Sequence, residues 1–171
     1  MIAATGLRIS EAIELRIADV QGDGALFIRY GKGGKSRVVP LHPTVVKALG
    51  TYLEARRRLP GVDDHLFLSA GRERISQQMV HYTFRRVLLL AGIAQNARRP
   101  CRIHDLRHTF ATHSLEKCPF RRDNVARHFV ALSTYLGHTQ IAYTYWYLEA
   151  TPQLMANIAI AADALIDKEC L

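Results

Sequence analysis

Residues 25–39 read ALFIRYGKGGKSRVV, and this stretch predicts an antiparallel hairpin. Its two ends, 25–30 and 35–39, are short and rich in residues that favour strands, while the glycines between them favour a turn. The turn carries Lys32 between glycines, which allow the backbone to come close to a ligand. The turn does not have the G-x-x-x-x-G-K-[ST] spacing of a P-loop, and on this feature alone a solvated turn lysine is the favoured interpretation.

The sequence on both sides of the hairpin predicts helices, because apolar residues recur at the spacing of a helix face. Ser76 fits a helix N-cap, and Val80, Phe84, Val87 and Leu88 of that helix are expected to face inward. The fold class is therefore expected to be mainly α with a small antiparallel β-sheet (α+β). The other predicted elements are helices over 8–16, 121–136 and 151–166, helices that begin at Pro43 and Ile103, and a short strand or loop over 65–68.

Composition restricts the function classes. The 171 residues are 49% hydrophobic, which suits one domain with a packed core. The formal net charge is +8, which favours a polyanionic partner, with DNA or RNA first and an anionic membrane surface second. No apolar run reaches the roughly 20 residues that cross a bilayer. The 3 cysteines are an odd number without zinc-finger spacing, which predicts a reduced, cytosolic protein rather than a disulfide scaffold.

The helix predicted from residue 103 carries the first candidate site. His104 and Arg107 are three positions apart, so both project from one helix face. Two cationic side chains together suit an anion between them, and a phosphate fits the fork of an arginine. An exposed polar face is the competing interpretation. A zinc site on His104 and His108 is a weaker alternative, because the pattern HExxH is absent and the nearby third ligands are Cys101 and Cys118.

Five stretches, in this order, resemble the catalytic domain of the tyrosine recombinase family, also called phage-type integrases. Each stretch alone is a weak signal, and their shared order and spacing carry the resemblance. Several aromatic residues lie in the last stretch, and such aromatic clusters usually belong to a core or to an interface. The stretches are ATGLRISE at 4–11, GKGGK at 31–35, HDLRHTFAT at 104–112, LGH at 136–138, and Tyr147 in a segment that also holds Tyr143, Tyr145 and Trp146.

The resemblance implies a set of catalytic side chains: Arg8, Glu11, Lys32, His104, Arg107, His138 and Tyr147. Arg8 and Arg107 would hold the scissile phosphate, because fixed cations stabilise the charge that grows in the transition state. The pKa of a free tyrosine phenol is about 10, so neighbouring cations must lower the pKa of Tyr147 for it to act as the nucleophile. Lys32 would protonate the leaving 5′ oxygen, and Glu11 would orient Arg8 or a histidine. Tyr143 and Tyr145 are off register and are expected to be packing residues.

The resemblance also implies the partners. The expected function is a site-specific DNA recombinase or integrase that needs no metal and no cofactor and acts on double-stranded DNA. A homotetramer is expected in the recombination synapse, and a monomer for the chain alone. The expected location is the cytoplasm, at the nucleoid or with a mobile element. Cations expected to bind the DNA backbone are Lys35, Arg37, Arg98 and Arg99, together with Arg56 to Arg58 and further arginines.

The sequence departs from the family pattern in three ways. The family's N-terminal core-binding domain, which clamps DNA, and the first helices of the catalytic domain have no counterpart before Thr5. The link at 116–132 is also longer than usual. Residues 1–171 are thus expected to be an N-terminally truncated catalytic domain. The alternative function is a DNA-binding remnant impaired in catalysis. A type IB topoisomerase uses related chemistry, but the LGH motif and the small size favour a recombinase.

Overall fold

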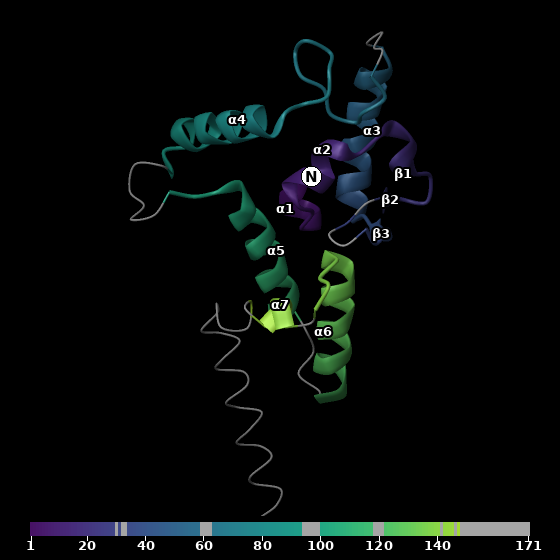
Figure 1. Cartoon of the computed structure of the whole chain (residues 1–171), viewed down its shortest axis with the longest axis vertical. Coiled ribbons are helices and arrows are strands. Elements are labelled where there is room, and N and C mark those ends of the chain that lie inside the picture. The colour runs from purple at the N-terminus through teal and green to yellow at the C-terminus, as the bar shows by residue number, and fades with distance from the viewer. Residues whose placement is uncertain are drawn as a thin grey trace, which may run out of the picture. The chain divides into compact units, whose positions relative to one another are not determined.

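A computed structural model describes residues 1–29, 31, 34–58, 63–93, 100–117, 122–140, 142–145 and 147, with the backbone alone at 122–126 and 145. The chain divides into two compact units, Met1–Arg107 and His108–Leu171. The first unit holds α1 (Ile2–Thr5), α2 (Ile9–Glu14), a 3-10 turn (Ile17–Asp19), β1 (Val20–Gln21), β2 (Ala25–Ile28), β3 (Arg37–Pro40), α3 (Pro43–Arg57) and α4 (Gln77–Leu90) (Figure 1). Helix α5 (Ile103–Glu116) begins in the first unit and ends in the second, which also holds α6 (Arg122–Leu136) and α7 (Ala142–Tyr145).

The predicted hairpin is confirmed as part of a three-stranded antiparallel sheet in the order β1-β2-β3. Leu26 lies opposite Val39, and both are 0% exposed. Val38 precedes Val39 on the same strand and is 51% exposed, because successive strand residues point to opposite faces. The mainly α fold with a small antiparallel sheet is thus confirmed. The strand β1 was not predicted, since two residues give no alternation to detect.

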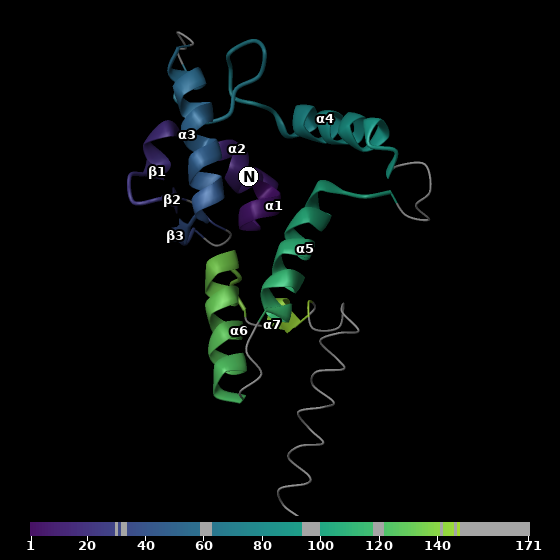
Figure 2. The same cartoon turned by 180° about the vertical axis from the view of Figure 1, so that it is seen from behind.

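Helix α3 begins at Pro43 as predicted, and it lies beside the sheet in both views (Figures 1 and 2). Its Leu49 is buried, and the hydroxyl of Tyr52 donates to the carbonyl oxygen of Leu66 at 2.9 Å. Arg56 is also buried, and its Nη2 donates to the carbonyl oxygen of Asp63 at 2.6 Å. The expectation that Arg56 binds DNA phosphates was therefore wrong, because this guanidinium is inside the fold and holds the following loop.

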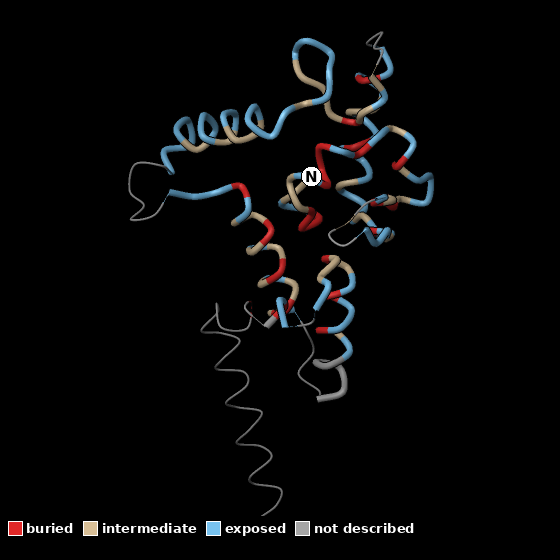
Figure 3. Tube along the Cα trace, in the orientation of Figure 1, coloured by how far each residue is buried: buried red, intermediate tan, exposed pale blue. Residues whose placement is uncertain are grey.

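Helix α4 is capped as predicted, with the Ser76 hydroxyl accepting from the backbone N–H of Met79 at 3.1 Å. The expectation that its apolar side faces inward was wrong in part, since no residue of α4 is buried (Figure 3). Val87 is 54% exposed, while Val80 and Leu88 are only partly covered. Helical periodicity identifies the apolar face of a helix, but it does not tell whether the fold covers that face.

The second unit has a small core where the end of α5 packs with α6. Helices α6 and α7 contact each other. Gly137 ends α6 with a φ of 65°, a left-handed conformation that glycine adopts without strain. The helix predicted over 151–166 lies outside the described residues. No helix in the described part of the chain is long and apolar enough to cross a membrane. The core residues are Ala111, Leu115, Phe129, Leu132, Leu136 and Tyr147.

Neighbouring valines of β3 provide a test of this sheet. We expect Val39→Ala to lower the free energy of unfolding by about 2 kcal/mol, because it removes two buried methyl groups and leaves a cavity. Val38→Ala, on the exposed face of the same strand, should change it by less than about 0.5 kcal/mol. Urea unfolding followed by circular dichroism measures both values. Equal costs for the two variants would contradict the register of β2 and β3.

Candidate functional site

The start of α2 carries two of the predicted site residues in direct contact. Arg8 directly precedes the helix, and Glu11 lies in its first turn. One carboxylate oxygen of Glu11, Oε2, accepts from the backbone N–H of Arg8 at 3.0 Å. The other, Oε1, accepts from the Arg8 guanidinium Nη1, also at 3.0 Å. A carboxylate at this position also interacts favourably with the positive end of the helix dipole.

A second arginine completes this network from the sheet. Arg37 on β3 donates from Nη1 to Oε1 of Glu11 and from Nη2 to Oε2, each at 2.9 Å. The side chains of Glu11 and Arg37 are only 3% and 10% exposed. Arg37 was expected to bind the DNA backbone, but both of its terminal nitrogens donate to Glu11 inside the fold. Its position two residues before the buried Val39 was a signal in the sequence, because residues two apart on a strand share a face.

The two arginines decide the protonation of Glu11. Burial alone raises the pKa of this carboxyl, since desolvation disfavours its charged form. The hydrogen bonds and positive charge of Arg37 and Arg8 outweigh burial and lower the pKa below the ordinary value of 4.5. Glu11 is therefore ionised at neutral pH.

The glycine-rich turn between β2 and β3 is described at Gly31, Gly34 and Lys35. The backbone N–H of Gly31 donates to the carbonyl oxygen of Lys35 at 3.0 Å, and that of Gly34 donates to the carbonyl oxygen of Gly31 at 2.9 Å. The side chain of Lys35 is exposed, as a contact to a phosphate requires. The predicted acid Lys32 and the predicted backbone cations Arg98 and Arg99 lie outside the described residues.

Helix α5 brings the second predicted phosphate-binding arginine to the segment that carries the first. Ile103, Arg107 and Ala111 are four positions apart and all buried, so Arg107 lies in the middle of the inner face of the helix. Arg107 is 2% exposed, and its Nη1 donates at 2.5 Å to the carbonyl oxygen of Gly6. Gly6 precedes Arg8 by two residues. The first unit therefore joins the two motifs that contain these arginines.

His104 is exposed and lines a cavity of about 680 Å³ together with residues of α4, among them Phe84 and Leu88. His108 contacts Tyr147 instead, with ring centroids 5.3 Å apart. Neither belongs to a group of three ligand side chains within the described residues, and the predicted third ligand Cys118 lies outside them. The geometry of the described residues therefore gives no support to a zinc site on these histidines.

One group of potential metal ligands does converge in the described part of the chain: Asp63, Asp64 and His65. Asp63 accepts from the backbone N–H of His65 at 2.9 Å, from its ring Nδ1 at 2.5 Å and from the backbone N–H of Arg74 at 2.9 Å. These contacts, with the His65 backbone bond the largest, lower the pKa of Asp63 to about 2. Asp64 is bound by Arg16 at 2.8 Å. The cluster is thus a set of loop contacts within the fold.

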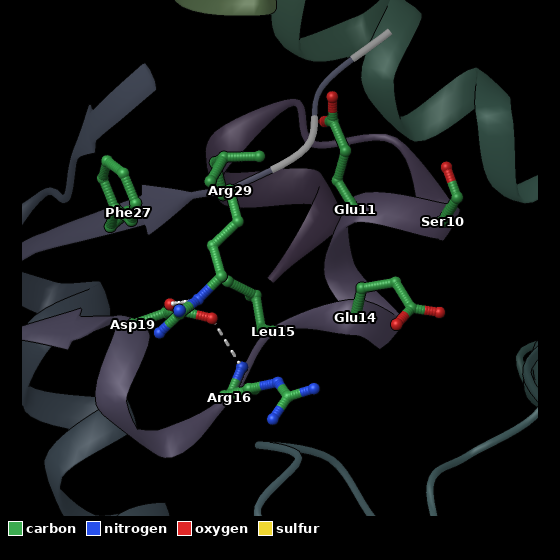
Figure 4. Close-up of a pocket in the computed structure, with 9 residues that line it drawn as sticks. Ser10, Glu11, Glu14, Leu15, Arg16, Asp19, Phe27 and Arg29 are labelled. Carbon is green, nitrogen blue, oxygen red and sulfur yellow. Dashed lines mark hydrogen bonds and ion pairs between the residues drawn. The ribbon is translucent and has the colours of Figure 1, made fainter. Parts of the chain in front are cut away.

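A second cavity, of about 530 Å³, lies beside Glu11 (Figure 4). Asp19 is 2% exposed and holds Arg29 by a 2.6 Å ion pair, and it accepts from the backbone N–H of Arg16 at 2.8 Å. Glu14, which also lines this cavity, is paired with Arg74. Asp19 and Arg29 pair within the lining, and its other charged side chains pair with residues outside it, so we interpret these residues as internal contacts of the fold.

The second unit brings together the predicted histidine and nucleophile of the last two motifs. The rings of His138 and Tyr147 are stacked, with centroids 6.0 Å apart and planes at 14°. His138 Nδ1 lies 2.7 Å from the hydroxyl oxygen of Thr144, which is 0% exposed. Tyr147 is 5% exposed, whereas Tyr143 is 44% exposed and contacts His138 edge-on. Sequence reasoning missed Thr144, since no spacing rule connects a threonine to a histidine six residues earlier.

The chain is similar in sequence and in fold to known proteins. The sequence profile of the Phage integrase family matches residues 1–153. A Sinorhizobium fredii protein named as an integrase/recombinase, y4rB, is 38% identical over 161 residues, which are 91% of this chain and 51% of that protein. The crystal structure of XerA recombinase is similar, with a TM-score of 0.76 and 31% identity over 92% of this chain and 52% of that one. The crystal structure of XerH recombinase, bound to palindromic difH substrate after cleavage, is also similar. Its TM-score is 0.70, and it is 27% identical over 92% of this chain and 42% of that one. The chain spans about half the length of the curated relatives it matches.

The contact between His138 and Thr144 can be tested without DNA. Thr144→Val removes the hydroxyl from a fully buried position, so His138 Nδ1 loses this partner and the imidazole ¹⁵N resonances should shift. Stability should fall by about 1–3 kcal/mol, the cost of a lost buried hydrogen bond. Thr144→Ser retains the hydroxyl and should leave the His138 resonances close to those of the parent chain. Unchanged resonances in Thr144→Val would show that the hydroxyl does not orient His138.

The Glu11 network predicts a pH dependence of stability. The pKa of Glu11 is lowered by folding, so its contribution is fully present above 4.5 and is lost as the pH falls through the lowered value. Glu11→Gln should destabilise the chain by about 3 kcal/mol at pH 7, because it leaves buried guanidinium charge without its carboxylate. The difference in the free energy of unfolding between the parent chain and Glu11→Gln, measured with urea, should be smaller at pH 3 than at pH 7. Glu54→Gln, at an exposed site, serves as the control. If this difference in the free energy of unfolding is the same at pH 7 and pH 3, the ion pairs of Glu11 do not contribute to stability as described.

Proposed function

The chain belongs to the phage integrase family, and we propose that it breaks and rejoins DNA strands through a 3′-phosphotyrosyl intermediate. The observation that carries this proposal is the buried hydrogen bond from Arg107 to Gly6, which joins segments 101 residues apart in the sequence. It supports a site in which Arg8 and Arg107 bind the same phosphate. The network around Glu11 supports the same site, because it orients Arg8.

The proposed reaction balances without an external energy source. The phenolic oxygen of Tyr147 attacks the phosphorus, and the bond from phosphorus to the 5′ oxygen breaks. The two arginines stabilise the negative charge that grows on the non-bridging oxygens. Lys32 is the proposed donor of the proton to the 5′ oxygen, and His104 and His138 are proposed to donate hydrogen bonds or move protons. One phosphoester replaces another, and a second 5′ hydroxyl then reverses the attack to rejoin the strand.

Double-stranded DNA is the proposed partner. The net charge of +8 supports binding to a polyanion, and the similar XerH structure is a complex with its DNA substrate. We propose that Lys35 contacts backbone phosphates, together with Arg98 and Arg99. Assembly as a homotetramer in the synapse, and a cytoplasmic location at the nucleoid or with a mobile element, are part of the same proposal.

The relatives also support a proposal about domain organisation. Since the chain spans about half of their length, we propose that residues 1–171 correspond to the catalytic half of such a recombinase. The second candidate function follows from the same observation. A chain that corresponds to half of a recombinase could bind DNA without exchanging strands, and a test of covalent chemistry separates the two candidates.

Nicked suicide DNA provides that test. After cleavage of such a substrate the short 5′ fragment diffuses away, so the protein stays attached to the 3′ phosphate and migrates more slowly on a denaturing gel. We expect this adduct with the parent chain and none with Tyr147→Phe, which lacks the attacking oxygen. Arg8→Lys and Arg107→Lys should each slow its formation by about 10²–10³-fold, as removal of one donor to a transition state does.

Tyr143→Phe is the matched control, because it removes a phenol from the same segment and should leave the adduct unchanged. An adduct that persists in Tyr147→Phe would reject Tyr147 as the nucleophile. DNA binding without any adduct in the parent chain would favour the DNA-binding remnant over the recombinase.

A further inference from the structure

The carboxylate of Glu11 is fully used as a hydrogen-bond acceptor. A carboxylate offers about four acceptor positions. Arg37 donates to both oxygens at 2.9 Å, the guanidinium of Arg8 donates to Oε1 at 3.0 Å, and the backbone N–H of Arg8 donates to Oε2 at 3.0 Å. Two of these four bonds therefore come from Arg37, and the other two hold the side chain and the backbone of Arg8.

We propose that Arg37 is a positioning residue, which fixes Arg8 and the start of the glycine-rich turn through the carboxylate of Glu11. This inference rests on the proposed function, in which Arg8 binds the scissile phosphate. Arg37 does not itself touch DNA in this proposal. Its fork holds Glu11 in the plane that suits two parallel N–H to oxygen bonds, and that plane directs Oε1 at Arg8.

Gly31 connects the turn to the same pair. A Cβ atom on Gly31 would lie 3.0 Å from Nη1 of Arg37 and 2.8 Å from the carbonyl oxygen of Lys35. The Glu11 Oε1 would be 3.7 Å away. The first residue of the turn therefore lies beside the ion pair, in a space too small for a larger side chain. The turn contains Lys32, the proposed acid, so Arg37 links the phosphate-binding arginine to the segment that carries the acid.

The charges around Glu11 make the role of Arg37 testable by pH. In the described part of the chain, Arg8 and Arg37 are the charged residues that contact Glu11, while Glu14 lies one turn further on and is paired with Arg74. Without Arg37, Glu11 keeps its burial and loses two hydrogen bonds and one positive charge. The carboxyl then takes up a proton at a higher pH, and the protonated form no longer attracts Arg8.

The experiment measures the rate of adduct formation on nicked suicide DNA from pH 5.5 to 8.5. We expect Arg37→Met to be slower than the parent chain by on the order of 100-fold at pH 5.5, since small misplacement of a catalytic group has effects of this size. The deficit should shrink several-fold toward pH 8.5, where Glu11 is ionised again. Arg37→Lys, which keeps the charge and loses the fork, should lie between the two.

Arg29→Met is the matched control, because Arg29 also pairs with a buried carboxylate of the same unit, Asp19, at 2.6 Å. It should stay within about twofold of the parent rate at every pH. The double variant Arg37→Met with Glu11→Gln controls for a loss of stability in Arg37→Met. It also removes the buried carboxylate that Arg37→Met leaves without its partner. Its deficit should be independent of pH. An Arg37→Met deficit below twofold, or one equal at all pH values, overturns the proposal.

A readout without DNA separates this inference from the proposed function. The Arg8 guanidinium Nε–H resonance, assigned by comparison with Arg8→Lys, should shift or broaden in Arg37→Met and stay unchanged in Arg29→Met. If the parent chain forms no adduct, the proposed function fails and this resonance alone decides the role of Arg37. An Arg8 resonance identical in the parent chain and in Arg37→Met would overturn the inference in either case.

Discussion

The buried carboxylate of Glu11 between two guanidinium groups is the interaction on which the first unit depends. Removing three charged groups from water costs free energy. Their mutual attraction compensates this desolvation only when the groups are well aligned and fully hydrogen-bonded. The carboxylate meets this condition because all of its acceptor positions are filled by Arg8 and Arg37. The carboxylate of Glu11 consequently connects the start of α2 with β3 and with the turn that precedes β3. Arg8, which we propose to bind the scissile phosphate, gains a fixed direction from this arrangement, and stabilisation of a transition state requires such a fixed direction.

The second constraint is the placement of Arg107 on the inner face of α5. A guanidinium that is 2% exposed must find acceptors inside the fold, and the carbonyl oxygen of Gly6 is one of them. Gly6 ends α1 with a φ of 63°, a left-handed conformation that glycine adopts without strain. In the second unit, the contact of His138 with Thr144 has the same character, since a buried hydroxyl fixes a ring that stacks on Tyr147. Side chains proposed to act on phosphate are thus held by neighbours that do not act on it.

Features encoded locally were predicted from the sequence. The hairpin of β2 and β3, the cap at Ser76 and the helix from Ile103 each depend on residues close together in the chain. Features that depend on distant residues were missed or predicted wrongly. Arg37 and Arg56 were expected to bind the DNA backbone, because net charge does not distinguish a solvated arginine from one bound inside the fold. The exposure of Val87 was missed for the related reason that periodicity does not show what covers a helix. The ordered motifs gave the family and its candidate residues, while the contacts that orient those residues came only from the structure.

The most direct test of the account is to locate the DNA on the protein. The adduct formed on suicide DNA can be digested with nuclease and protease, and the peptide that carries the remaining nucleotide can be sequenced by mass spectrometry. The account predicts a nucleotide linked through its 3′ phosphate to the phenolic oxygen of Tyr147. A nucleotide on Tyr143 or Tyr145, or a linkage through a 5′ phosphate, would contradict it.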